Sequence, residues 1–109
     1  MSANEQLTAI QDAFKASQID VVKELAKAFL ESNPERIEGF NYMGKALLVE
    51  QDFDMADYYF LKAKNIEPSN IDILLNLAQL NLEMREVDIA RHYYNSILKV
   101  DASNMFAEI

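Results

Sequence analysis

The sequence predicts an all-α protein in which antiparallel helical hairpins stack on one another. Pro34 recurs 34 residues later as Pro68, and many apolar and acidic positions follow the same spacing. Between these prolines the apolar residues recur at i, i+3, i+4 and i+7, which is the spacing of a helix and not of a strand. Only two glycines and two prolines occur in 109 residues, so the connections between helices are expected to be short.

The 34-residue spacing divides the chain into three helical hairpins. In the middle hairpin, the first helix has an apolar face from Phe40 to Leu47, and the second helix has one from Ala56 to Ala63. The six expected helices span residues 4–16, 19–31, 37–50, 53–66, 71–84 and 87–100.

Turn residues mark where helices end and begin again. Pro68 cannot continue a helix, and Ser69 or Asn70 is placed to cap the next one. The segment Ala102-Ser103-Asn104 repeats this signal, so residues 105–109 are expected to begin a further, truncated helix. We therefore expect one domain over residues 1–109, with repeats at about 3–36, 37–70 and 71–104.

The middle and third hairpins resemble the tetratricopeptide repeat, which has large apolar, small and aromatic residues at set positions and a closing proline. The middle hairpin matches with Phe40, Met43, Gly44, Leu47, Ala56, Phe60, Ala63 and Pro68. The third matches with Leu74, Leu77, Ala78, Ala90, Tyr94 and Ile97, and departs at Asn81 and Ala102. The resemblance implies a short right-handed tetratricopeptide-type solenoid, in which Phe60 and Tyr94 fill the gaps between hairpins.

The first hairpin departs most from this pattern. Leu7, Ile10 and Phe14 align with it only if one residue is deleted from the turn between the two helices. Ala26 and Phe29 also reverse the usual order of large and small residues. A different turn is therefore expected in the first hairpin.

Composition excludes several classes of function. The 10 basic and 18 acidic residues give a net charge of −8, which argues against a nucleic-acid partner because binding to phosphates requires clustered cations. Without cysteine, the chain has no disulfide, thiolate metal site or cysteine nucleophile. The N-terminus lacks the basic flank and apolar core of a secretory signal, and no apolar run is long enough to span a membrane. We expect a cytoplasmic protein with no membrane partner.

No catalytic, cofactor or metal site is expected. The single histidine, His92, has no cysteine or second histidine with which to share a metal, and a solvated position explains it better. Asp52, Asp54 and Asp57 lack the glycine turn and the closing glutamate of a calcium loop. Their place at the start of a helix, where negative charge interacts favourably with the helix dipole, explains these three residues better.

The candidate binding site is the concave surface formed by the first helix of each hairpin, because stacked repeats commonly bind there. Helical phase and the resemblance direct ten residues into this groove: Glu38, Asn41, Lys45, Leu48, Val49, Asp72, Leu75, Gln79, Leu82 and Glu83. Leu48, Leu75 and Leu82 lie off the packing stripe and are expected to form an apolar strip. This strip either anchors a partner or packs against a following helix.

The acidic groove residues favour a partner peptide or helix that is amphipathic and carries basic residues. Tetratricopeptide co-chaperones hold C-terminal carboxylates with lysine, arginine and asparagine side chains in the same groove. The corresponding positions here hold Thr8, Asp12, Tyr42, Asp72 and Asn76, so this clamp is not expected.

Three functions fit the sequence. The first is a non-catalytic scaffold for protein–protein interaction through the groove. The second is the non-catalytic repeat segment of a larger multidomain enzyme, such as a glycosyltransferase-like protein. The third is a structural module that self-associates, because solenoids without a polar cap can stack end to end.

Overall fold

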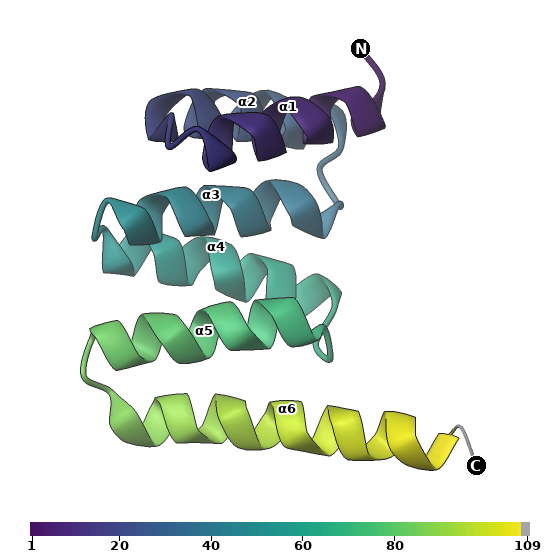
Figure 1. The fold of residues 1–109 in the computed structure, drawn as a ribbon, viewed down its shortest axis with the longest axis vertical. Coiled ribbons are helices and arrows are strands. Elements are labelled where there is room, and N and C mark those ends of the chain that lie inside the picture. Colours follow the sequence, from purple (N-terminus) through teal and green to yellow (C-terminus); the bar gives the residue numbers. More distant parts are fainter. Residues whose placement is uncertain (108–109) are drawn as a thin grey trace.

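A computed structural model of the chain describes the backbone of residues 1–107 and the side chains of residues 1–102. Within residues 1–107 there are six α-helices and no strand, which confirms the predicted fold class (Figure 1). The helices are α1 (Ala3–Lys15), α2 (Ile19–Ser32), α3 (Ile37–Val49), α4 (Phe53–Ile66), α5 (Ile71–Glu83) and α6 (Val87–Ala107).

The helices form three hairpins that stack in chain order, from α1 and α2 at one end of the molecule to α6 at the other (Figure 1). Each helix packs on the next one in the sequence, and α3 also contacts α1 and α5. The first helices of the three hairpins therefore form one continuous surface.

The turn inside each hairpin has the same backbone conformation. Ser17, Gln51 and Arg85 lie 34 residues apart, and all three have a positive φ, near 60°. In each turn the N–H of the next residue donates a hydrogen bond to the backbone carbonyl five residues earlier, which closes a Schellman motif. These bonds run from Gln18 to Ala13 (2.9 Å), Asp52 to Leu47 (2.9 Å) and Glu86 to Asn81 (2.7 Å). The turn of the first hairpin is therefore as long as the other two, and the prediction that it lacks one residue is wrong.

The turns between hairpins use proline and side-chain caps. Pro34 and Pro68 each follow a helix C-cap, and a backbone hydrogen bond of 3.2 Å closes each turn. The Asn70 side chain then accepts from the N–H of Ile73 at 3.2 Å and caps α5. Asp52 caps α4 in the same way, by accepting from the N–H of Met55 at 3.4 Å, so this residue has a structural role at the start of the helix.

The middle hairpin is held together by a glycine against an aromatic ring. Phe60 is completely buried, and a Cβ added at Gly44 would lie 2.5 Å from its ring. The lack of a side chain at Gly44 therefore allows α3 and α4 to approach closely. Ala56 and Ala63, also fully buried, keep the same face of α4 small.

The first hairpin builds the same packing with the sizes exchanged. With a 34-residue register, Ile10 takes the position of Gly44, and Ala26 takes the position of Phe60. Both Ile10 and Ala26 are fully buried. The large residue has moved to the first helix and the small residue to the second, so the space between the helices is still filled.

Two expectations about the C-terminal part are wrong. Tyr94 does not fill a gap between hairpins. It is 38% exposed, because no helix covers this side of α6 in the part of the chain that the structure describes. The buried ring is that of the neighbouring Tyr93. The further helix expected at residues 105–109 is not separate, since α6 runs without a break to Ala107. Residues 108 and 109 lie outside the described residues.

One carboxylate on a second helix lies where its negative charge is unfavourable. Asp57 is half-buried on α4, and burial together with the nearby Asp54 charge raises the pKa of its carboxyl group. Burial and the Asp57 charge in turn raise the pKa of Tyr93 on α6. Asp57 is therefore more easily protonated in the folded chain than in the unfolded one.

The Gly44–Phe60 contact predicts the cost of two substitutions. Phe60→Ala should lower the free energy of unfolding by about 3 to 5 kcal/mol, because a fully buried ring is lost. Gly44→Ala should lower it by about 1 to 3 kcal/mol through overpacking. In the double variant the added methyl group enters the space left by the ring, so the loss should be smaller than the sum of the two. Urea denaturation measures all three, and strict additivity would contradict the contact.

The raised pKa of Asp57 predicts a pH-dependent effect. Because the folded state binds this proton more tightly, Asp57 lowers stability as the pH rises above its ordinary pKa of 3.8. Asp57→Asn should raise the melting temperature at pH 7, and the gain should disappear near pH 3.5. Glu24→Gln, which removes an exposed acid on α2, serves as the control and should give no gain. A lower melting temperature for Asp57→Asn at pH 7 would contradict the assignment.

Candidate functional site

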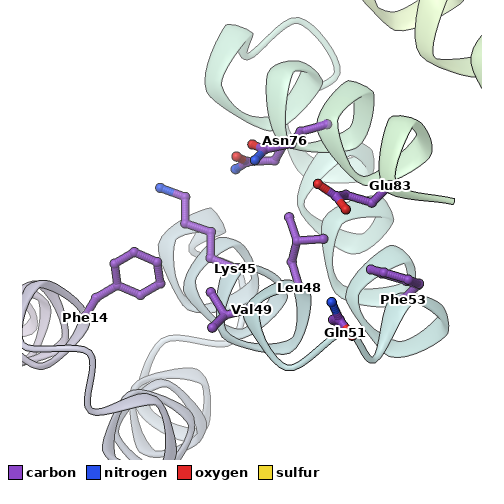
Figure 2. Close-up of a pocket in the computed structure, with 9 residues that line it drawn as sticks. Phe14, Lys45, Leu48, Val49, Gln51, Phe53, Asn76 and Glu83 are labelled. Carbon is purple, nitrogen blue, oxygen red and sulfur yellow. The ribbon is translucent and has the colours of Figure 1, made fainter. Parts of the chain in front are cut away.

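A groove lies where the first helices α3 and α5 run side by side, close to the turns that end them (Figure 2). It has a volume of about 450 Å³ and is open to solvent. Its lining residues are Phe14, Lys45, Leu48, Val49, Gln51, Phe53, Asn76, Gln79 and Glu83.

The floor of the groove is apolar. Leu48 and Val49 come from the last turn of α3, Phe53 from the first turn of α4, and Phe14 from the last turn of α1. Leu48 and Phe53 pack against the core, whereas Val49 is 57% exposed. Figure 2 shows Leu48 between the two helices, with Val49 and Phe53 on either side. An apolar side chain entering here would lose water on several sides at once.

A lysine lies over two aromatic rings at the α1 side of the groove. Phe14 and Tyr42 meet edge to face with their centroids 6.0 Å apart. The Lys45 Nζ lies 5.2 Å from the Tyr42 centroid and 5.9 Å from the Phe14 centroid, within cation–π range. Lys45 forms no ion pair with a carboxylate in the part of the chain that the structure describes. Its ammonium group is therefore available to a ligand.

Two amides bridge α3 and α5 across the groove. Asn76 Nδ2 donates to Asn41 Oδ1 at 2.7 Å, and both side chains are half-buried. This bond ties the two helices together and occupies one acceptor of Asn41. Gln79, one turn further along α5, is exposed and lines the groove.

The acidic residues of the groove differ in their partners. Arg36 donates from Nη2 and Nε to the two Glu38 carboxylate oxygens, at 2.6 and 3.3 Å. Burial opposes the charge of Glu38, but the bonds from Arg36 and from its own backbone N–H outweigh this and lower its pKa. Asp72 and Glu83 on α5 are exposed and form no ion pair among the described residues. The net negative charge of this surface thus comes chiefly from α5.

The structure brings together five of the ten predicted groove residues, namely Lys45, Leu48, Val49, Gln79 and Glu83. Asn41 is outside the lining but is hydrogen-bonded to Asn76, which lines the groove, and Glu38 is paired with Arg36. Asp72, Leu75 and Leu82 lie on α5 outside the lining. Leu75 is 45% and Leu82 46% exposed, so the expected strip of three leucines has one member in the groove and two beyond it.

Three lining residues were missed from the sequence, namely Phe14, Gln51 and Phe53, and a fourth, Asn76, was noted only as a position of the carboxylate clamp. Phe14 was assigned to the packing stripe because of the deletion assumed in the first turn. In the correct register it is equivalent to Leu48 and Leu82, two residues that were predicted to face the groove. The repeat spacing therefore held a signal for Phe14, whereas Phe53 and Gln51 reach the groove only through the folding back of α4.

Side chains suited to metal binding do not converge in the part of the chain that the structure describes: no three His, Cys, Asp or Glu residues form a group there. His92 is exposed and stacks edge to face on Tyr93, with the centroids 5.6 Å apart. Among the described residues, no helix is long and apolar enough to cross a membrane.

Comparison with known proteins identifies the fold. No protein-family model and no curated protein matches the sequence. The TPR2B domain of yeast Sti1, in complex with pHsp70, matches with a TM-score of 0.86 and 19% identity over 93% of this chain and 81% of that chain. The first TPR of Spaghetti (RPAP3), bound to the HSP90 peptide SRMEEVD, matches with a TM-score of 0.85 and 13% identity over 92% and 79%. The Arabidopsis OM64 TPR domain matches with a TM-score of 0.83 and 16% identity over 92% and 83%.

These structures are tetratricopeptide-repeat domains, and the chain has the tetratricopeptide-repeat fold. The resemblance inferred from the sequence is thereby confirmed at the level of the fold. At these identities the likeness extends to the backbone and leaves the binding residues to be judged from their own geometry.

The bond between the two amides predicts a coupling between α3 and α5. Asn41→Ala and Asn76→Ala should each lower the free energy of unfolding by about 0.5 to 1.5 kcal/mol. The double variant should lose less than the sum, because either substitution removes the same bond. Chemical denaturation of the four proteins checks this. Additive losses would show that the two amides act independently.

Proposed function

We propose that the chain is a non-catalytic protein-binding module that receives a segment of a partner protein in the groove between α3 and α5. The observation that supports it most directly is an open groove of about 450 Å³ with an apolar floor and polar groups at its edge. Grooves of this composition bind peptides by taking in an apolar side chain and orienting the backbone or neighbouring side chains with polar groups.

The chemistry of the groove suggests the kind of segment. An apolar side chain would fill the floor between Leu48, Val49 and Phe53. Basic residues of the segment would face Glu83 and Asp72, which are exposed and unpaired among the described residues, while Lys45 would take a single acceptor. The net charge of −8 adds a general repulsion of acidic segments. An amphipathic segment with basic residues is thus favoured.

The structural neighbours support a peptide as the class of ligand, since one was solved with an HSP90 peptide and another in a complex with pHsp70. The residues that would hold a terminal carboxylate differ here. In the register set by the turn at Ser17, Leu7 and Gln11 take the places expected for Thr8 and Asp12, and Asp72 would repel a carboxylate. We therefore propose a different ligand from an acidic C-terminal tail.

We propose a cytoplasmic location for this module, as expected from the sequence. Self-association, the other binding mode expected there, has its own supporting observation in the exposed apolar side chains of α6. It concerns a different face of the molecule and does not compete with the groove.

Selection of a displayed random-peptide library against the chain, followed by fluorescence polarisation with the enriched peptides, tests the groove. Val49→Glu should weaken binding about tenfold or more, because an exposed floor residue becomes a charge and the fold is undisturbed. Binding should also weaken with added salt as the attraction to Glu83 is screened.

Lys27→Glu provides the control, since Lys27 is exposed on α2, away from the groove. It should bind like the parent chain. Leu75→Glu, on α5 beyond the lining, reports whether the bound segment extends along that helix. Equal binding by the parent and Val49→Glu, with both folded by circular dichroism, would place the site elsewhere.

A further inference from the structure

The second helices of the three hairpins differ in how well one face is covered. Four positions on this face recur at 34-residue intervals, so the same positions can be compared in α2, α4 and α6. In the same order, they are Ile19, Lys23, Ala26 and Leu30 in α2, Phe53, Asp57, Phe60 and Lys64 in α4, and Val87, Arg91, Tyr94 and Leu98 in α6. All eight residues in α2 and α4 are buried or half-buried, whereas all four in α6 are exposed.

The covering element in the first two hairpins is the helix that follows. Leu30 of α2 packs against Gly39 of α3, where an added Cβ would lie 2.6 Å from the leucine. Lys23 pairs at 2.8 Å with Glu50, directly after α3, and this bond raises the pKa of the lysine. In the same way α5 packs on α4. This face of a second helix is therefore built to receive another helix that runs antiparallel to it.

We propose that Val87, Arg91, Tyr94 and Leu98, here named the α6 seam, pack antiparallel against the α6 seam of a second copy of the chain. Val87 is 53% exposed and Leu98 is 65% exposed, so both apolar side chains gain from being covered. The seam residues are spaced by four, three and four positions, which keeps them on one line along a helix pair.

The α6 seam is complementary to itself in the antiparallel direction. When Val87 faces Leu98 of the second copy, Arg91 faces Tyr94 of that copy, and each contact occurs twice. A guanidinium over a tyrosine ring is a favourable pair, and Arg91 is free to turn because its 3.3 Å bond to Asp88 is highly exposed. On one flank, Asp88 then comes next to Asn95 and Lys99 of the second copy, which gives an opposite-charge contact.

A symmetric pair fits the chain better than an open stack. In an open stack the α6 seam would meet α1 of the next copy, but the exposed side chains of α1 are polar, including Glu5, Gln11 and Asp12. The α6 residues with described side chains carry two acids and two bases besides His92, so this helix does not add to the repulsion expected from a net charge of −8. A two-fold pair of α6 seams also closes after two copies.

Sedimentation equilibrium from about 10 µM to about 1 mM tests the proposal, because a contact through one helix per copy belongs to the small, weak class of interfaces. The parent chain should approach twice the monomer mass as its concentration rises. Leu98→Glu should remain monomeric. Ile89→Glu is the matched control: Ile89 is an exposed apolar residue of α6, about half a turn away from the seam, and its variant should dimerise like the parent.

Charge reversal tests the direction of the pair. Lys99→Asp should weaken the dimer about threefold or more, and Asp88→Lys together with Lys99→Asp should restore it, because the contact between copies is then rebuilt with the signs exchanged. The chain has no cysteine, so Val87→Cys and Leu98→Cys proteins can be mixed and oxidised. The mixture should form more disulfide-linked dimer than either variant alone.

A parent chain that stays monomeric at about 1 mM would overturn the proposal, and would assign the α6 seam to a helix of a different protein or segment. Dimers that Ile89→Glu abolishes and Leu98→Glu leaves intact would also overturn it. A cross-link that forms best with Leu98→Cys alone would contradict the antiparallel pairing.

Discussion

The close approach of α3 and α4 at Gly44 is the contact on which the rest of the structure depends. A side chain there would meet the Phe60 ring at 2.5 Å, so this ring, fully buried, lies directly on the backbone of α3. A single amphipathic hairpin cannot cover the outer side of such a ring, and α5 must do so. The position of α5 beside α3 follows from this packing, and with it the groove that lies between them.

The first hairpin satisfies the same constraint with different residues. Ile10 and Ala26 exchange the sizes found at Gly44 and Phe60, while the turn at Ser17 keeps the conformation found at Gln51 and Arg85. Backbone geometry is thus more regular than the sequence pattern. The total volume between the helices is the quantity that must be kept, and either helix can supply it.

The sequence predicted the fold well because its signals are local. The prolines and the helical spacing gave five of the six helices to within one residue at each end. The end of α6 was mispredicted because Ala102 stands where Pro34 and Pro68 stand in the earlier repeats, and without proline nothing in this stretch stops the helix. The three turn residues with positive φ gave no signal either, since none of them is a glycine.

The candidate site was predicted in part, and the reason lies in what helical phase can indicate. Phase gives the direction in which a side chain leaves its helix, and this was enough for Lys45, Val49 and Gln79. It does not give the partner that a side chain meets. Asn41 and Glu38 were predicted to face a ligand in the groove, yet Asn76 and Arg36 already bind them.

The groove and the α6 seam are two consequences of the same stacking. Each first helix offers its free face to the concave surface, and each second helix offers its outer face to the next hairpin. Leu48 and Leu82 illustrate the difference between an inner and a terminal hairpin: they occupy equivalent positions, but the inner one is half-buried beside α5, and the terminal one is 46% exposed. Exposure in the third hairpin therefore reflects the lack of a covering helix among the described residues, whereas exposure at Val49, in the middle of the stack, does not. On this physical ground we propose a ligand for the apolar floor of the groove and a helix of a second copy for the α6 seam.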